Sequence, residues 1–168
     1  VRLFEAASGN VKKIIFASSS SVYGGSEDLP IEEPTQKNPK SPYAWQKSCI
    51  EDYAKMCWDL YKLDIVCLRY FNVFGPGQYG DSPYSTAVSA WCHAIKNNKM
   101  LRSDGDGTQS RDLCYVDNVV DANGIIQSAL FISSNNMLLF LMLSLKNFHS
   151  SGVKVNPKYL FSRTVVPL

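Results

Sequence analysis

The chain has 168 residues, a formal net charge of +2 and 45% hydrophobic residues. This composition is typical of a soluble globular protein and excludes a disordered or fibrous chain. The sequence contains no run of basic residues, so we expect no nucleic-acid partner. The five cysteines are widely spaced and include no C-x-x-C pair, which argues against a zinc knuckle or a disulfide framework and favours a reducing compartment.

Strands and helices are predicted to alternate along the chain. The apolar run 12–17 ends in serines and predicts a buried strand, and the prolines between residues 24 and 42 predict a loop. Ser41 followed by Pro42 is typical of a helix N-cap and first helical position, so we expect a helix from there to about Tyr61.

The second half of the chain repeats this pattern. Residues 65–71 predict the next strand, and Ser82 with Pro83 repeats the cap signal before a helical stripe that includes Val88 and Ile95. The Gly-Asp-Gly sequence at 105–107 predicts a turn, and Asp117 is a candidate N-cap for a helix that ends near Leu130. The order strand, helix, strand, helix predicts βαβ units and an α/β fold with a parallel sheet.

The alternating pattern of strand and helix signals is lost after about Leu130. An apolar run follows at 137–145, which is too short to cross a bilayer, since a membrane-spanning helix needs about 20 residues. The run is compatible with a buried helix or strand, or with a tail outside the fold. We therefore divide the chain into a domain at 1–130 and a divergent tail at 131–168, and we expect no membrane contact.

Tyr43 and Lys47 form the first candidate for catalysis. Side chains at positions i and i+4 lie on the same face of a helix, so the two groups are expected one turn apart. A nearby ammonium favours the phenolate by Coulomb attraction, which would make this tyrosine a general base. The chain has nine tyrosines, so a chance pairing is the alternative.

Four serines follow the first predicted strand, at positions 18–21. In parallel α/β sheets, ligands bind at the carboxyl ends of the strands. A serine hydroxyl at this end, with Tyr43 and Lys47 at the start of the following helix, would form a Ser–Tyr–Lys set. A plain serine-rich turn is the alternative.

The chain resembles the extended short-chain dehydrogenase/reductase family, and within it the nucleotide-sugar epimerases of the UDP-N-acetylglucosamine or UDP-glucose type. The resemblance covers roughly residues 1–130, and it implies part of a Rossmann-like, doubly wound parallel sheet. Four ordered motifs carry it: ASSSSVYG at 17–24, SPYAWQK at 41–47, LRYFNVFGP at 68–76 and GDGTQSRDLCYVD at 105–117.

The resemblance implies a role for each matching residue. Ser19, Tyr43 and Lys47 would be catalytic. The NAD-binding set would be Ala17, Ser18, Tyr43, Lys47, Tyr70 and Phe71. The set that contacts a UDP-sugar would be Ser19, Ser20, Ser21, Asn72, Tyr84, Ala87, Val88 and Arg111. In many relatives an aromatic side chain near Arg102–Asp104 stacks on uracil, and its absence here puts that stacking in question.

The implied reaction is 4-epimerisation, in which Tyr43 removes the sugar 4-hydroxyl proton and NAD takes and returns a hydride. A sugar-nucleotide 4,6-dehydratase is disfavoured because such relatives carry Asp-Glu just after the catalytic hydroxyl, where Ser20 and Ser21 stand. A decarboxylase is disfavoured for a similar reason, while a reductase stays open. The alternative of a different class is a truncated, non-catalytic remnant.

Gly75–Gly80 spells G-x-G-x-x-G, but the predicted helix begins beyond it, so we do not expect a dinucleotide fingerprint there. The Gly-rich turn that relatives carry upstream is absent, and the chain starts at Val1, so we expect a fragment that does not bind NAD normally. No signal peptide precedes Lys12, so we expect a cytoplasmic protein, and the resemblance implies a possible homodimer through the Tyr43 helix. Neither histidine has partners at metal-ligand spacing, so no metal is expected.

Overall fold

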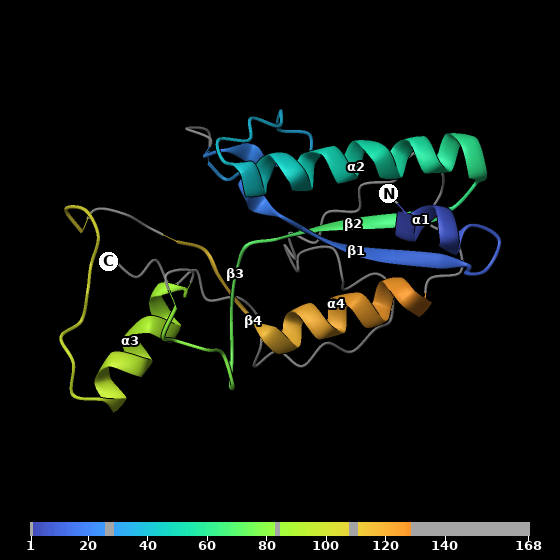
Figure 1. Ribbon diagram of the computed structural model, residues 1–168. Coiled ribbons are helices and arrows are strands. Elements are labelled where there is room, and N and C mark those ends of the chain that lie inside the picture. Colours follow the sequence, from blue (N-terminus) through green and yellow to red (C-terminus); the bar gives the residue numbers. More distant parts are fainter. Residues whose placement is uncertain (1, 26–28, 83–84, 108–110, 129–168) are drawn as a thin grey trace. The chain divides into compact units, whose positions relative to one another are not determined.

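The computed structural model describes residues 2–25, 29–82, 85–107 and 111–128, which fall into two compact units. Within those ranges, the first unit contains residues up to Tyr70 together with 122–128, and the second contains Phe71 to Asp121 (Figure 1). Leu130 and the predicted tail at 131–168 lie outside the described residues.

The first unit is built around a parallel pair of strands. Its elements are α1 (Arg2–Ala7), β1 (Lys13–Ser19), the 3₁₀ helix η1 (Ser20–Tyr23), α2 (Pro42–Tyr61) and β2 (Asp64–Tyr70). Strands β1 and β2 pair in parallel from Lys13 opposite Asp64 to Ser19 opposite Tyr70, and α2 connects them. The predicted strand–helix–strand unit is therefore confirmed.

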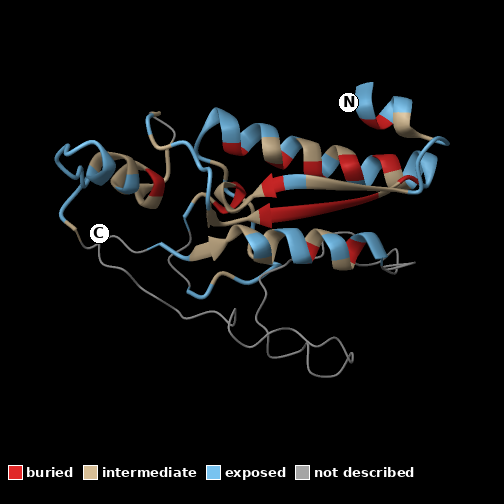
Figure 2. Cartoon of the chain, turned by 90° about the horizontal axis from the view of Figure 1, so that it is seen from below, coloured by how far each residue is buried: buried red, intermediate tan, exposed pale blue. Residues whose placement is uncertain are grey.

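Both faces of strand β2 are buried because consecutive strand residues point to opposite sides of the sheet. On one face, Ile65 and Cys67 pack with Phe4 of α1 and with Ala54 and Cys57 of α2. The opposite face joins a separate cluster, which consists of Val66, Leu68 and Ile126, the last from the end of α4. Figure 2 shows this layering, with the buried residues gathered along β2 and on parts of the neighbouring helices.

Helix α2 begins where the sequence predicts. The Ser41 side chain accepts a hydrogen bond from the backbone N–H of Ala44 at 3.1 Å, and Pro42 occupies the first helical position. The helix ends at Tyr61, and Lys62 adopts a left-handed conformation with a φ of 54°. These local signals fix the length of the helix that carries Tyr43 and Lys47.

The second unit contains two strands that the sequence analysis did not predict. Strands β3 (Asn72–Phe74) and β4 (Leu113–Tyr115) pair in parallel. The unit also holds α3 (Ala87–Lys96) and the first residues of α4 (Val116–Ser128), whose last turns belong to the first unit. Across the described residues the fold is mixed α/β with two separate parallel strand pairs.

Two predicted helix starts were wrong. Helix α3 begins at Ala87 with Thr86 as its N-cap, so the cap predicted at Ser82 does not start a helix. Asp117 lies in the first turn of α4, not at its cap. In both cases a polar residue near the start of an apolar pattern indicated that a helix was close, but it did not determine the residue at which the helix begins.

The Gly75–Gly80 segment connects β3 to the loop before α3, and no helix opens inside it. A Cβ at Gly80 would collide with the backbone oxygen of Ser89, and one at Gly75 would collide with Val116. These glycines therefore allow close packing within the second unit. The structure agrees with the expectation that the segment is not a dinucleotide fingerprint.

Candidate active site

Lys47 reaches the carboxyl end of strand β1. Its Nζ donates a hydrogen bond to the backbone oxygen of Ala17 at 2.6 Å and lies 4.8 Å from the centre of the Phe16 ring. Ala17 stands two residues before Ser19, the last residue of the strand. The ammonium therefore lies at the end of the sheet where ligands of parallel α/β proteins bind.

Tyr43 lies beside this lysine, as the spacing on the helix predicts. The centre of its ring is 5.6 Å from Lys47 Nζ, and the residue is 55% exposed. An ammonium at this distance makes a cation–π contact with the ring, and more than half of the residue is open to solvent. The structure thus brings together two of the three residues predicted to be catalytic.

The predicted serines form the turn that follows β1. Ser19 caps helix η1: its Oγ accepts hydrogen bonds from the backbone N–H of Ser21 at 3.2 Å and from Ser21 Oγ at 2.9 Å. Because a hydroxyl can accept two hydrogen bonds and donate one, the Ser19 proton is still available for a ligand. Ser20, which lies between Ser19 and Ser21, is the first residue of the 3₁₀ helix η1.

Ser18 has a different environment from the serines around it. Its side chain is buried, and its hydroxyl donates to Glu51 Oε1 at 2.5 Å. Only its backbone is left for the cofactor contact that the resemblance implies. The sequence analysis did not identify Glu51 or its partner Arg69, although a charged residue inside an apolar strand is a signal that a buried partner must exist.

The ends of β1 and β2 lie side by side, with Ser19 opposite Tyr70. The Tyr70 hydroxyl exchanges hydrogen bonds with the Asn123 side chain, accepting from Nδ2 at 2.9 Å. Tyr70 and Phe71 are both half-buried, and Phe71 is the first residue of the second unit. Their proposed contact with nicotinamide stays a prediction.

A second cluster of predicted residues lines a cavity of about 400 Å³ within the second unit. Asn72 lines it from the start of β3 and Arg111 from the segment just before β4, and Ala87 and Val88 line it from the start of α3. The structure therefore brings together four residues predicted to bind substrate. Tyr84, which was predicted with them, lies outside the described residues.

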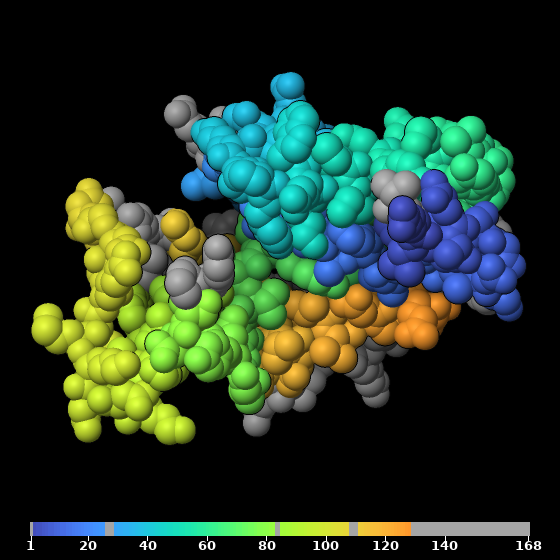
Figure 3. Space-filling model, in the orientation of Figure 1, coloured from blue at the N-terminus to red at the C-terminus, as the bar shows by residue number. Residues whose placement is uncertain are grey.

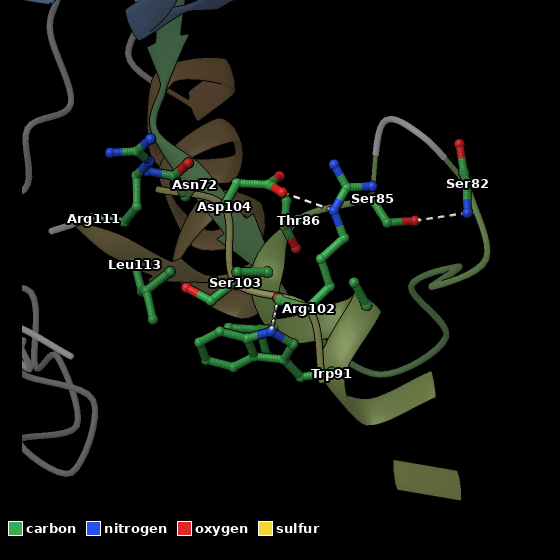
Figure 4. A pocket seen from close by; sticks show the side chains of 13 residues that line it. Asn72, Ser82, Ser85, Thr86, Trp91, Arg102, Ser103, Asp104, Arg111 and Leu113 are labelled. Atoms are coloured by element: carbon green, nitrogen blue, oxygen red, sulfur yellow. Dashed lines mark hydrogen bonds and ion pairs between the residues drawn. The ribbon is translucent and has the colours of Figure 1, made fainter. Parts of the chain in front are cut away.

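The cavity also contains polar residues that received no binding role from the sequence. Arg102 Nε donates to Asp104 Oδ1 at 2.7 Å, and the Trp91 indole N–H donates to the Arg102 backbone oxygen at 2.8 Å (Figure 4). On the Arg111 side of the cavity, Asn72 Nδ2 donates to the Asp112 backbone oxygen at 2.9 Å. Because Arg102 pairs with Asp104, Arg111 is the lining arginine whose guanidinium we consider for an anionic ligand, since a guanidinium matches phosphate oxygens in pairs.

Two further findings concern metal-binding side chains and membrane-spanning helices. Within them, no group of three His, Cys, Asp or Glu side chains is placed to hold a metal ion. None of the described helices combines the length and the apolar character needed to span a bilayer.

Comparison with known proteins decides the family. Residues 1–129 match the NAD dependent epimerase/dehydratase family. The chain belongs to this family. The match covers both units and every residue predicted for the site, and it confirms the resemblance drawn from the four motifs.

Members of the epimerase/dehydratase family with different activities are similar to the chain. The UDP-glucose 4-epimerase of Mycolicibacterium smegmatis is 40% identical over 126 residues, which are 73% of this chain and 39% of that protein. The human dTDP-D-glucose 4,6-dehydratase is 34% identical over 117 residues, which are 70% of this chain and 32% of that protein.

A solved family structure is similar over most of the chain. The UDP-N-acetylglucosamine 4-epimerase of Methanobrevibacter ruminantium, solved with UDP-N-acetylmuramic acid, matches with a TM-score of 0.76 and 40% identity. The match covers 83% of this chain and 44% of that one. The chain thus spans less than half the length of these relatives.

Proposed function

We propose that the protein acts in NAD-dependent 4-epimerisation of a nucleotide sugar of the UDP-N-acetylglucosamine or UDP-glucose type. The observation that carries this proposal is the placement of Tyr43 and Lys47 near the carboxyl end of β1, the strand whose last residue is Ser19. The 40% identity to a UDP-glucose 4-epimerase and to a UDP-N-acetylglucosamine 4-epimerase supports this choice within the family.

The donor set at this strand end fits the nicotinamide end of NAD. Lys47 offers an ammonium for a ribose hydroxyl, Tyr43 offers the hydroxyl of an exposed residue, and Tyr70 offers a half-buried ring. When bound, NAD supplies the reversible hydride acceptor that epimerisation at a carbinol carbon requires. The hydrogen bond from Lys47 to the Ala17 carbonyl, which keeps the ammonium near the carboxyl end of β1, supports this part of the proposal.

The side chains divide the proton chemistry among them. Tyr43, as phenolate, takes the proton from the sugar 4-hydroxyl, and the Lys47 ammonium stabilises that phenolate. The Ser19 hydroxyl donates a hydrogen bond to the same sugar oxygen and orients it. Tyr43 then returns the proton when the inverted alcohol forms.

The cavity of the second unit would hold the nucleotide diphosphate. Arg111 presents a planar guanidinium that can bind two phosphate oxygens at once, and Asn72 lines the same cavity. Val88 and Ala87 add an apolar wall from helix α3. In this proposal, the first unit supplies the reaction and the second unit supplies the substrate recognition.

A homodimer through helix α2 is part of the proposal. Figure 3 shows the residues of α2 at the surface of the molecule. Trp45, Met56 and Leu60 of this helix are exposed although they are large and apolar. Exposed apolar residues on one helix are typical of a surface that a second copy covers.

Proton NMR of the protein with NAD and UDP-N-acetylglucosamine or UDP-glucose tests the proposed reaction. We expect new anomeric signals from the 4-epimer, and Tyr43→Phe should reduce the rate by roughly 10²–10⁴-fold, because that is the usual contribution of a general base. Tyr61→Phe is the matched control, since Tyr61 lies at the other end of the same helix. Equal rates for the two variants would refute the assigned base.

A 4,6-dehydratase is the second candidate, favoured by the 34% identity to the human dTDP-D-glucose 4,6-dehydratase. The same spectra distinguish it, since loss of water would remove the C6 hydroxymethylene signals. The first turn after Ser19 contains Ser20 and Ser21, whose hydroxyls are weak acids and bases for elimination. Absence of NAD binding in an equilibrium titration, together with absence of turnover, would support a non-catalytic remnant.

A further inference from the structure

A buried ionic cluster joins the three elements that carry the proposed catalytic groups. Ser18 is on β1, Arg69 is on β2 and Glu51 is on α2. Arg69 donates from Nε to Glu51 Oε1 at 2.8 Å and from Nη2 to Oε2 at 2.6 Å, while the Ser18 hydroxyl shares Oε1. All three residues are at most 5% exposed.

Two neighbours complete the cluster. The Tyr23 ring of η1 lies 4.8 Å from Arg69 Cζ, and Lys37 Nζ lies 3.8 Å from Glu51 Oε2. Lys37 also donates to the exposed Asp52 carboxylate at 2.5 Å. Burial alone would lower the pKa of Arg69, but hydrogen bonding to Glu51 and Tyr23 outweighs it and raises this pKa. The guanidinium therefore stays charged.

Stability alone does not explain such a cluster. The cost of removing two charges from water offsets most of their attraction, and well-packed apolar residues often stabilise a core as well as a buried ion pair does. A bidentate pair that also accepts a hydroxyl differs from apolar packing because it fixes the relative positions of its partners in both distance and angle. The cluster is thus suited to setting geometry.

The partners lie next to the proposed catalytic groups. Ser18 directly precedes Ser19, and in the β1–β2 register it stands opposite Arg69. Glu51 follows Lys47 by one helical turn, so the two residues lie on the same side of α2. A shift of α2 along the sheet would break the contacts of Glu51 and would move the Lys47 ammonium away from the Ala17 carbonyl.

We propose that Ser18, Glu51 and Arg69 are positioning residues, which hold α2 against the end of β1 and thereby keep the Lys47 ammonium on the Ala17 carbonyl, two residues before Ser19. The positioning is a property of the first unit. Only its consequence for catalysis rests on the proposed function.

Amine acylation of the folded chain, read by mass spectrometry, measures this positioning directly. The readout is the acylation rate of Lys47 relative to that of Lys55, an exposed lysine on the same helix. In Ser18→Ala and Glu51→Gln we expect this ratio to rise roughly three- to tenfold, because Lys47 loses the hydrogen bond to Ala17 that protects its amine. Thermal unfolding monitored by circular dichroism confirms that each variant is folded at the labelling temperature.

Asp52→Asn is the matched control. Asp52 follows Glu51 on α2, and both carboxylates pair with Lys37. The substitution therefore removes a carboxylate of the same kind, but the Asp52 side chain is 72% exposed and lies outside the buried cluster. We expect its Lys47 ratio to stay within about 1.5-fold of the wild type. If Glu51→Gln does not fold, Ser18→Ala decides the question, because it removes only a neutral hydroxyl.

An unchanged ratio in folded Ser18→Ala and Glu51→Gln would overturn the proposal. Equal acceleration of every lysine would also overturn it, because that result indicates global loosening. Activity separates the two proposals: a chain without epimerase activity that still shows the expected acylation pattern would refute the function and leave the positioning intact. Where turnover is present, both variants should lower kcat more than they raise KM.

Discussion

The two units bury their residues very differently. Every buried hydrophobic residue of the described ranges belongs to the first unit, whereas Ser89 is the one buried residue described in the second. The proposed proton chemistry depends on side chains fixed against a closed core. The proposed recognition of the nucleotide uses a cavity whose walls are half-buried or exposed, so its side chains are less tightly held.

Strand length explains part of this difference. Strand β2 has seven residues and is covered on both faces, while β3 and β4 have three residues each and are half-buried throughout. A short pair offers few apolar positions per face, so it contributes little to a core. The predictions below compare matched changes in the two units.

Cysteine reactivity should show the largest contrast. Burial, with a smaller contribution from Glu51, raises the pKa of the Cys67 thiol from 9.0 to about 12, which lowers its thiolate fraction at pH 8 roughly a thousandfold. Cys92 on α3 is exposed. We expect iodoacetamide to modify Cys92 rapidly and Cys67 only after unfolding, as measured by peptide mapping. If the modification rates of Cys67 and Cys92 lay within tenfold of each other, the core of the first unit would be open to the reagent.

Two isoleucines provide the matched test of packing. Ile65 on β2 is fully buried at 0% exposure, and Ile95 on α3 is 64% exposed. Ile65→Ala should lower the free energy of unfolding by about 2–5 kcal/mol, because it removes buried methyl groups and leaves a cavity. Ile95→Ala should change it by less than about 0.5 kcal/mol. Urea unfolding of both variants measures the difference, and similar losses would contradict the contrast.

Arg111 tests the recognition side of the comparison. Because a hydrogen bond to a charged group contributes about 1.5–3 kcal/mol, Arg111→Ala should weaken UDP binding at least roughly tenfold in isothermal titration calorimetry. Arg2→Ala is the control, since Arg2 is an exposed arginine on α1 of the first unit. Arg111→Lys should fall between them, because an ammonium cannot bind two phosphate oxygens in the same plane. An unchanged affinity in Arg111→Ala would remove this residue from the proposed site.

The sequence predicted the first unit better than the second. The strands at 13–19 and 64–70 and the helix at 42–61 depend on continuous apolar runs and on a cap, which are local signals. Strands β3 and β4 are too short for a recognisable period, and they were missed. Sequence similarity to the family, not periodicity, indicated Arg111 and Asn72.

The contacts that could not be predicted are those between distant positions. Glu51 and Arg69 are separated by 18 residues, and neither position shows its partner in the sequence. Arg69 gave the clearest available signal, because a guanidinium inside a buried strand requires a counter-charge. Which carboxylate supplies it depends on how α2 lies on the sheet, and that is set by packing.

Substitutions at the helix N-caps should change the free energy of unfolding least. In the first unit, the Ser41 side chain caps α2 through Ala44, while in the second unit Thr86 makes no side-chain hydrogen bond to the first turn of α3 in the capping position. Ser41→Ala should therefore lower the free energy of unfolding by about 1 kcal/mol. Thr86→Ala should lower it by roughly a few tenths of a kcal/mol, because the hydrogen bonds of the Thr86 hydroxyl within the described residues go to the Gln78 and Ser89 side chains and not to the backbone of the first turn. Urea unfolding resolves the difference. An equal loss would mean that the start of α3 depends on Thr86 as strongly as α2 depends on its cap, and that the second unit is more firmly built than its exposure indicates.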